Sequence, residues 1–143
     1  MTEHLDAFNE DPREIMAAID ARLVSLRTLI DDAMARSEQE IGQHLKDMAR
    51  HLEERRIKHE AARAELARSA ERESAEPADK TAEWTRARDT SRLHLRADRL
   101  ERAAAAAMYI AATAVEEAAQ ACLAALLARR QAIAIQIQRA DEP

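Results

Sequence analysis

Apolar residues recur along the first half of the chain at alternating spacings of three and four. The positions are Met16, Ile19, Leu23, Leu26, Ile30 and Ala33. This spacing is the seam of a coiled-coil heptad repeat, so it predicts a long helix that packs against another helix. The seam resumes at Ile41, eleven residues after Ile30, which predicts a stutter where the supercoil locally unwinds.

The second half carries two parallel tracks of positions seven residues apart. One track is Leu93, Leu100, Ala107, Ala114, Ala121, Ala128 and Ile135, and the other is Ala97, Ala104, Ala111, Ala118, Ala125 and Ala132. Alanine lets the backbone of a partner helix approach closely, and the large side chains of the first half can fill the remaining space. The tracks therefore predict a second long helix whose alanine seam faces the first.

Two short stretches interrupt the helical pattern. Asp11-Pro12-Arg13-Glu14 is a start signal, because Asp11 can cap a helix, proline suits its first position and Glu14 suits a capping box. Residues 74–81 contain Pro77 and small polar residues, with Asp79 or Thr81 available to cap the next helix. We expect a flexible acidic segment over 1–11, one domain over 12–139 and a tail over 140–143. The helices should cover about 12–73 and 80–139, joined by a turn at about 74–80.

The predicted fold is all-α, a long antiparallel helical hairpin with coiled-coil packing. Each helix has about 60 residues, or about 90 Å at 1.5 Å per residue. If the hairpin folds about Pro77, residues whose numbers sum to about 154 face each other. Leu23 should then lie opposite Gln131, and Leu52 near Arg102.

The second helix is too apolar around its circumference to have one neighbour. Its polar remainder, Thr113, Glu116, Glu117 and Gln120, is expected to form a narrow stripe. We therefore predict a dimer of hairpins that forms a four-helix bundle at the open, alanine-rich end. The expected interface residues are Leu23, Leu26, Ile30, Ala104, Ala111, Val115, Ala118, Ala125, Leu126 and Ile133.

Composition agrees with an elongated helical protein. The 143 residues are 47% apolar and 34% charged, with one glycine and three aromatic residues, too few rings for a thick globular core. The acidic start resembles no signal peptide. The longest uncharged run, 103–115, is shorter than the about 20 residues of a membrane span, so we expect no transmembrane segment. Cys122 has no disulfide partner, which favours a reducing cytoplasm.

Charge is uneven along the chain. Residues 1–45 hold 4 basic and 10 acidic side chains, whereas 46–74 and 80–102 together hold 15 basic and 11 acidic ones. A docking arm for an acidic partner is one interpretation of the basic excess, and a solvated stem with charge pairs four residues apart is the favoured one. Nucleic acid and the membrane surface are minor alternatives. The arm's arginines are Arg86, Arg88, Arg92, Arg96 and Arg99.

The sequence offers little catalytic chemistry. His44, His51 and His59, with nearby carboxylates, are weak candidates for metal ligands, but the Glu-x-x-His pairs of carboxylate bundles are missing. One glycine excludes a glycine-rich phosphate loop. We therefore predict a non-enzymatic, self-associating scaffold or interaction module that needs no cofactor. The alternatives are a partner-dependent chaperone or secretion stalk that receives a foreign helix, and a metal-binding bundle.

Overall fold

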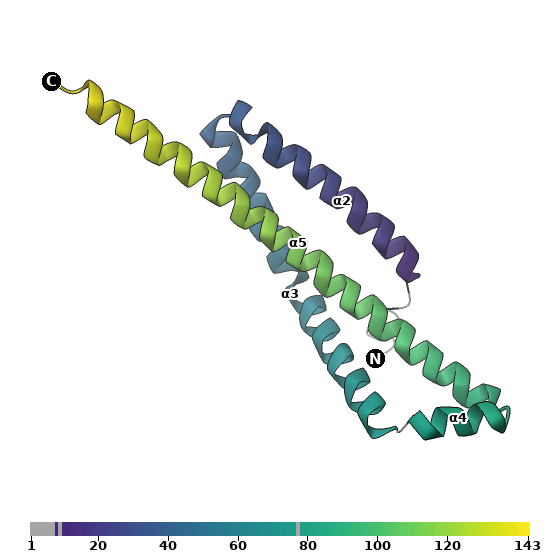
Figure 1. The fold of residues 1–143 in the computed structure, drawn as a ribbon. Helices are drawn as coiled ribbons and strands as arrows, with labels where there is room; N and C mark the ends of the chain where they lie inside the picture. The colour runs from purple at the N-terminus through teal and green to yellow at the C-terminus, as the bar shows by residue number, and fades with distance from the viewer. Residues whose placement is uncertain (1–7, 9, 77) are drawn as a thin grey trace. The chain divides into compact units, whose positions relative to one another are not determined.

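The computed structural model describes residues 8, 10–76 and 78–143, and the regular structure in them is helical. The elements are α2 (Pro12–Asp32), the 3-10 helix η1 (Ala33–Ala35), α3 (Glu38–Ala75), α4 (Ala78–Arg86) and α5 (Thr90–Asp141) (Figure 1). The all-α prediction is confirmed, and the long helices α3 and α5 pack antiparallel. The prediction of two helices of about 60 residues is wrong, because the described residues form four α-helices. The expected flexible segment falls mostly outside the described residues.

Helix α2 begins where the sequence predicts. Pro12 is its first residue, and the Arg13 N–H donates a hydrogen bond of 2.9 Å to Asp11 Oδ1. Asp11 therefore acts as the cap that satisfies one of the free N–H groups of the first turn.

The chain reverses between α2 and α3, where the sequence pattern had suggested a continuous helix (Figure 1). Arg36 adopts an extended conformation, with φ −94° and ψ 154°. Ser37 then caps α3: its Oγ accepts a hydrogen bond of 3.2 Å from the Glu40 N–H and lies 3.3 Å from the Glu40 carboxylate. Ser37 is thus the N-cap of a Ser-x-x-Glu sequence, and its hydroxyl donates to the Glu40 carboxylate. The eleven-residue interval between Ile30 and Ile41 therefore marks a reversal and not a stutter.

The second connection is longer than the predicted turn, because it contains α4. Arg88 has a left-handed backbone with φ 53°, and Arg88 N–H donates to the Thr85 carbonyl at 3.2 Å. Asp89 N–H donates to the Trp84 carbonyl at 2.9 Å, which completes a Schellman motif at the end of α4. Asp89 then caps α5 by accepting from the Arg92 N–H at 3.2 Å.

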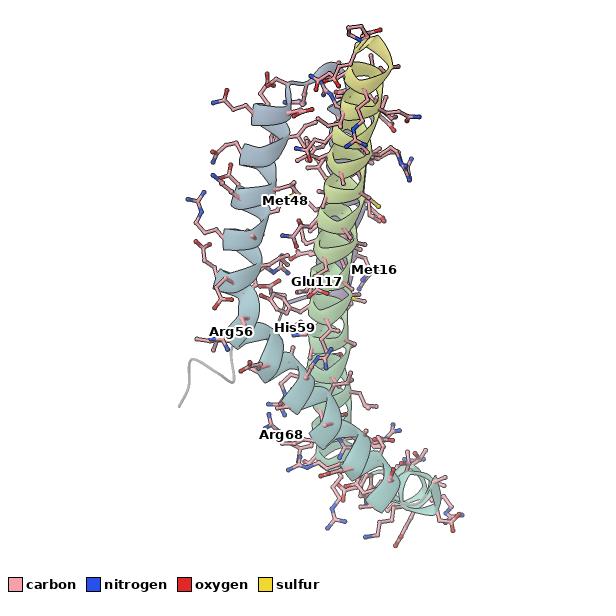
Figure 2. All side chains as sticks on the ribbon, turned by 90° about the vertical axis from the view of Figure 1, so that its left-hand side faces the viewer. Met16, Met48, Arg56, His59, Arg68 and Glu117 are labelled. Atoms are coloured by element: carbon pink, nitrogen blue, oxygen red, sulfur yellow. The ribbon has the colours of Figure 1, made fainter. Side chains whose placement is uncertain are left out.

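Contacts divide the chain into two units, which we describe separately. Unit 2 comprises residues 20–55 and 113–143, so α2, α3 and α5 all contribute to it. Its core is apolar and comes from these helices and η1, with Met48 on the side of α3 that faces α5 (Figure 2). The buried core residues are Leu26, Ala33, Ile41, Met48, Ala119 and Leu123.

Unit 1 comprises residues 1–19 and 56–112, and its described core is built mostly from alanine. The buried members are Phe8, Ala62, Ala105 and Ala106. Ion pairs line this thin core: Arg99 pairs with Glu73 and with Glu76, and Arg96 pairs with Glu73 at 3.2 Å.

The antiparallel register in unit 1 differs from the predicted one. Arg102 Nε lies 4.0 Å from Glu65 Oε1, and the Lys58 ammonium lies 4.7 Å from the centre of the Tyr109 ring. The expected placement of Leu52 near Arg102 is therefore wrong. The extra helix α4 lengthens the connection and moves the pairing by about a dozen residues.

One helix in the described part of the chain, α5, is long and apolar enough to cross a membrane by length and composition. Core helices of soluble proteins pass the same test, and 22% of its apolar stretch is buried here. The expected absence of a transmembrane segment therefore stays a prediction.

We predict that Arg88→Gly stabilises the protein. An L-residue in the left-handed region is strained by about 1–2 kcal/mol, whereas glycine is not, and glycine's extra entropy in the unfolded chain offsets part of the gain. The free energy of unfolding should rise by about 0.5–1 kcal/mol, measured by urea denaturation. Arg86→Gly, in the last turn of α4, is the control and should lower it by about 1 kcal/mol. A loss for both variants would contradict the assignment of strain to Arg88.

Candidate functional site

Half of the predicted interface residues gather around one apolar groove in unit 2. The groove has a volume of about 320 Å³ and lies between α2 and α5. Its lining residues are Leu23, Leu26, Arg27 and Ile30 from α2 and Val115, Ala118, Ala119 and Cys122 from α5. Arg27 is the one charged side chain in this lining, so the groove is suited to apolar groups.

The groove has a fixed base and an open rim. Leu26 is 3% exposed and belongs to the core, whereas Leu23 is 40% exposed. Ala118 and Cys122 are also exposed. The base of the groove is thus part of the core of unit 2, while the apolar side chains at its rim are exposed at the surface.

Beside the groove, an ion pair connects α2 to α5. Arg22 Nε donates to Glu116 Oε1 at 2.5 Å and Arg22 Nη2 donates to Glu116 Oε2 at 3.1 Å. The Glu116 side chain is 5% exposed and the Arg22 side chain 48% exposed. Arg22 is thus level with Glu116, and because the Arg130 guanidinium donates to the Arg36 carbonyl, α2 and α5 run parallel. Leu23 does not therefore lie opposite Gln131 in a hairpin as expected.

The pKa of Glu116 reflects two opposing effects. Burial alone would raise it, because a charged carboxylate loses its hydration. The hydrogen bond from Arg22 and the positive charges of Arg22, His51 and Arg55 act in the other direction and together leave the pKa below its ordinary value. Glu116 therefore stays ionised at neutral pH and stabilises the position of α2.

The alanine seam of α5 points away from the core of unit 2. The positions Ala111, Ala114, Ala118, Ala121, Ala125, Ala128 and Ala132 are all exposed, and we call them the alanine stripe. In the part of α5 that belongs to unit 2, the buried positions are instead Thr113, Glu116, Ala119 and Leu123. Between Ala111 and Ala132 the seam is therefore not buried in the core, although Ala118 lines the groove together with Leu23, Leu26 and Ile30 of the first helix. Two residues of the predicted polar stripe, Thr113 and Glu116, are buried. The Glu116 carboxylate can be buried because it forms an ion pair with the Arg22 guanidinium.

The other predicted interface residues lie in several environments. Ala104, in unit 1, is half-buried, and Leu126 packs beside the core of unit 2. Ala111 and Ala125 are exposed on the alanine stripe, and Ile133 is 47% exposed near the end of α5. The role of these residues in association stays a prediction.

The arginines of the predicted docking arm are largely engaged within unit 1. Arg99 is buried and pairs with Glu73 and Glu76, and Arg96 also pairs with Glu73. The hydrogen bond from Arg96 and the positive charges of Arg96 and Arg99 lower the pKa of Glu73. Arg92 pairs with Asp89 at 3.4 Å and lies over the Trp84 ring.

The other two arginines of the predicted arm are exposed: Arg86 is the last residue of α4, and Arg88 follows it. Arg92, Arg96 and Arg99 thus contribute to the fold of unit 1, and a docking role for the arm stays a prediction.

The candidate metal ligands do not come together. Across residues 8, 10–76 and 78–143, no three histidine, cysteine or acidic side chains gather where they could hold a metal ion. The Arg36 guanidinium lies 3.4 Å from His44 Nε2, and His51 contributes positive charge near Glu116. His59 is half-buried in unit 1.

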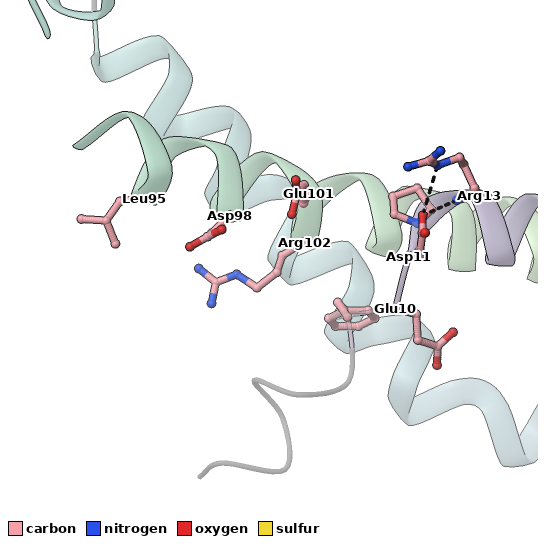
Figure 3. A pocket seen from close by; sticks show the side chains of 9 residues that line it. Glu10, Asp11, Arg13, Leu95, Asp98, Glu101 and Arg102 are labelled. Atoms are coloured by element: carbon pink, nitrogen blue, oxygen red, sulfur yellow. Dashed lines mark hydrogen bonds and ion pairs between the residues drawn. The ribbon is translucent and has the colours of Figure 1, made fainter. Parts of the chain in front are cut away.

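A second hollow, of about 540 Å³, lies in unit 1 (Figure 3). It is lined by Phe8, Glu10, Asp11, Pro12, Arg13, Leu95, Asp98, Glu101 and Arg102. Arg13 already pairs with Asp11 at 3.8 Å. The hollow mixes both signs of charge and so selects no ligand class.

Two elements of the site were missed from the sequence. Ser37 caps α3 where the chain reverses, and the Ser-x-x-Glu spacing of Ser37 and Glu40 is visible in the sequence. The buried position of Glu116 carries no such signal, because only the fold brings Arg22 to it. No protein-family model, curated protein or solved structure matches this chain.

We predict that Glu116→Gln destabilises the protein in a pH-dependent way. A carboxylate with a lowered pKa contributes stability above the unfolded pKa of about 4.3 and loses it as pH falls through the folded pKa. The variant should lose about 1–2 kcal/mol at neutral pH, because glutamine cannot offer a charged partner to Arg22. The difference from the unmodified chain should shrink below about pH 4, as followed by thermal unfolding with circular dichroism.

Glu117→Gln is the matched control, since the neighbouring Glu117 is exposed. Its stability should equal that of the unmodified chain across the same pH range. A loss from Glu116→Gln that is equally large in acid would show that the pair contributes through shape and not through charge.

Proposed function

We propose that this chain is a non-enzymatic coiled-coil module that self-associates through the alanine stripe and the adjoining groove of unit 2. The observation that carries the proposal is the exposure of seven alanines at alternating spacings of three and four along α5. That spacing is a complete heptad seam, yet no helix of unit 2 covers it. The module is a scaffold for a reducing, cytoplasmic setting.

The alanine stripe requires a partner of a particular kind. Alanine side chains gain contact only when the partner backbone comes close, and close approach requires small side chains on both helices. α5 of a second copy carries such a face, with the same repeat. We therefore propose that the partner of the alanine stripe is a second copy of this chain.

Magnitudes indicate that the groove is needed as well. Seven methyl groups from each copy, at about 0.8 kcal/mol each, give about 11 kcal/mol when fully buried. Association itself costs about 4–15 kcal/mol in lost rotational and translational freedom. The alanines alone are thus marginal, and the exposed rim of the groove, above all Leu23, supplies the remaining apolar area.

We predict that the protein is a dimer and that Ala118→Glu with Ala125→Glu makes it a monomer. Both positions are exposed within the chain, so the variant should keep its helical content. In the dimer each carboxylate would be buried without a partner, which should weaken association by at least about 100-fold. Sedimentation equilibrium measures the mass, and circular dichroism checks the fold.

Ala49→Glu with Ala64→Glu is the matched control, because these alanines are exposed on α3, away from the stripe. The control should remain a dimer. An unmodified chain that sediments as a monomer would overturn self-association and favour the alternative in which the face receives a helix of another protein.

A further inference from the structure

We infer that residues 20–35 form a hinged arm within unit 2, and that the carboxylate of Glu116 keeps this arm closed by attracting cations of both α2 and α3. The arm acts within a single chain and is independent of self-association. Its position matters to the candidate site, because Leu23, Leu26 and Ile30 of the arm form one wall of the groove. The groove is therefore present only while the arm is closed.

The arm has few buried side chains of its own. Leu26 and Ala33 belong to the buried core cluster, and Leu29 and Ile30 pack against that cluster from half-buried positions. The other apolar side chains of the arm are exposed, among them Val24 at 61%. A segment with so few buried contacts opens at a lower cost in free energy than the core beside it.

The packing of α3 on α5 has a buried core that does not come from the arm. Ile41 and Met48 of α3 and Ala119 and Leu123 of α5 belong to the buried cluster, and Leu45 of α3 packs against it. These two helices therefore retain apolar contacts with each other when the arm moves away.

The hinge of the arm is Arg36. Its backbone is extended, with φ −94° and ψ 154°, so the regular helical conformation ends there. The Arg36 carbonyl accepts a hydrogen bond from the Arg130 guanidinium of α5, and Ser37 caps α3 directly afterwards. The chain is thus anchored from Arg36 onward, and the residues before it can turn about this point.

Three positive side chains act on the Glu116 carboxylate. Arg22 reaches it from α2 with hydrogen bonds of 2.5 and 3.1 Å. The positive charges of His51 and Arg55, both on α3, also favour its ionised form. The Glu116 side chain is 5% exposed, so solvent screens these attractions little. One carboxylate of α5 therefore attracts both neighbouring helices.

Removing the charge of Glu116 reverses this effect. The cations of α2 and α3 that it attracts would then repel each other, with no negative charge to compensate them. Arg22 is 48% exposed and gains hydration when it moves outward, whereas Arg55 lies on a helix that the core holds against α5. The arm is consequently the part that moves.

The first experiment measures hydrogen exchange of the full chain at neutral pH by mass spectrometry, in increasing urea. If the arm opens by itself, amides of residues 20–35 should be at least about 10-fold less protected than those of 41–55 and 117–130. Their exchange should also depend less on urea, because opening the arm exposes less surface than unfolding the unit. Equal protection in all three segments, lost together in urea, would overturn the hinged arm.

A second comparison tests the charge. In Glu116→Gln the arm should exchange about 10- to 100-fold faster than in the unmodified chain, the range expected when a hydrogen bond between charged groups is weakened. Its exposed neighbour provides the control, Glu117→Gln, which should change nothing. If Glu116→Gln fails to fold, Arg22→Gln should release the same arm, with Arg27→Gln as its exposed control on α2. Unchanged exchange of the arm would overturn the role of the carboxylate.

A double-mutant cycle tests the link to α3. Arg55→Gln is measured alone and together with Glu116→Gln. The double variant should exchange in the arm at least about 3-fold more slowly than the product of the two single effects, because the second change removes a repulsion that the first creates. Effects that simply multiply would overturn the link between the two helices. A monomeric chain with the full pattern would support the hinged arm and overturn the proposed self-association.

Discussion

The reversal of the chain at Arg36 and Ser37 determines where α2 lies, and the candidate site depends on that position. The chain leaves the helical conformation at Arg36, and Ser37 caps the start of α3. The Arg130 guanidinium of α5 donates a hydrogen bond to the Arg36 carbonyl. The reversal is thereby connected to α5 as well as to α3. Without it, Leu23 and Ile30 would continue the line of α3 and could not form one wall of a groove with Val115.

Within unit 2, α2 is held in place by both an apolar core and a polar contact. Leu26 belongs to the buried cluster, while Arg22 binds Glu116 from α5. Apolar packing among alanines and leucines specifies position poorly, because many rotations about a helix axis bury similar area. A buried carboxylate is more selective, since leaving it without its guanidinium partner is strongly unfavourable. The ion pair therefore fixes the rotation of α2 that exposes Leu23.

The all-α fold class could be predicted from the sequence, because the heptad spacing, the single glycine and the Asp11-Pro12 helix start are local signals. The arrangement of the helices could not. Ser37 and Glu40 carried a readable capping signal, but the continuing apolar seam across it suggested a stutter. The left-handed conformation of Arg88 had no signal in the sequence, because the residue usually found in that conformation is glycine.

The candidate site shows the same division. Leu23, Ile30, Val115 and Ala118 were expected at an interface, and they do line one groove. Which face of α5 remains uncovered depends on the inward turn of Glu116, and that follows from a contact between residues 94 positions apart. Local patterns cannot specify such a contact.

The alanine core of unit 1 has a thermodynamic consequence. Ala62, Ala105 and Ala106 are almost fully buried, yet each removes little apolar area from water. The heat capacity change of unfolding scales with that area, so its value for unit 1 should fall below the about 12–15 cal/mol/K per residue of ordinary globular domains. A small heat capacity change flattens the dependence of stability on temperature. Unit 1 is thus expected to resist cold denaturation, since little of its stability comes from the hydrophobic term that weakens on cooling.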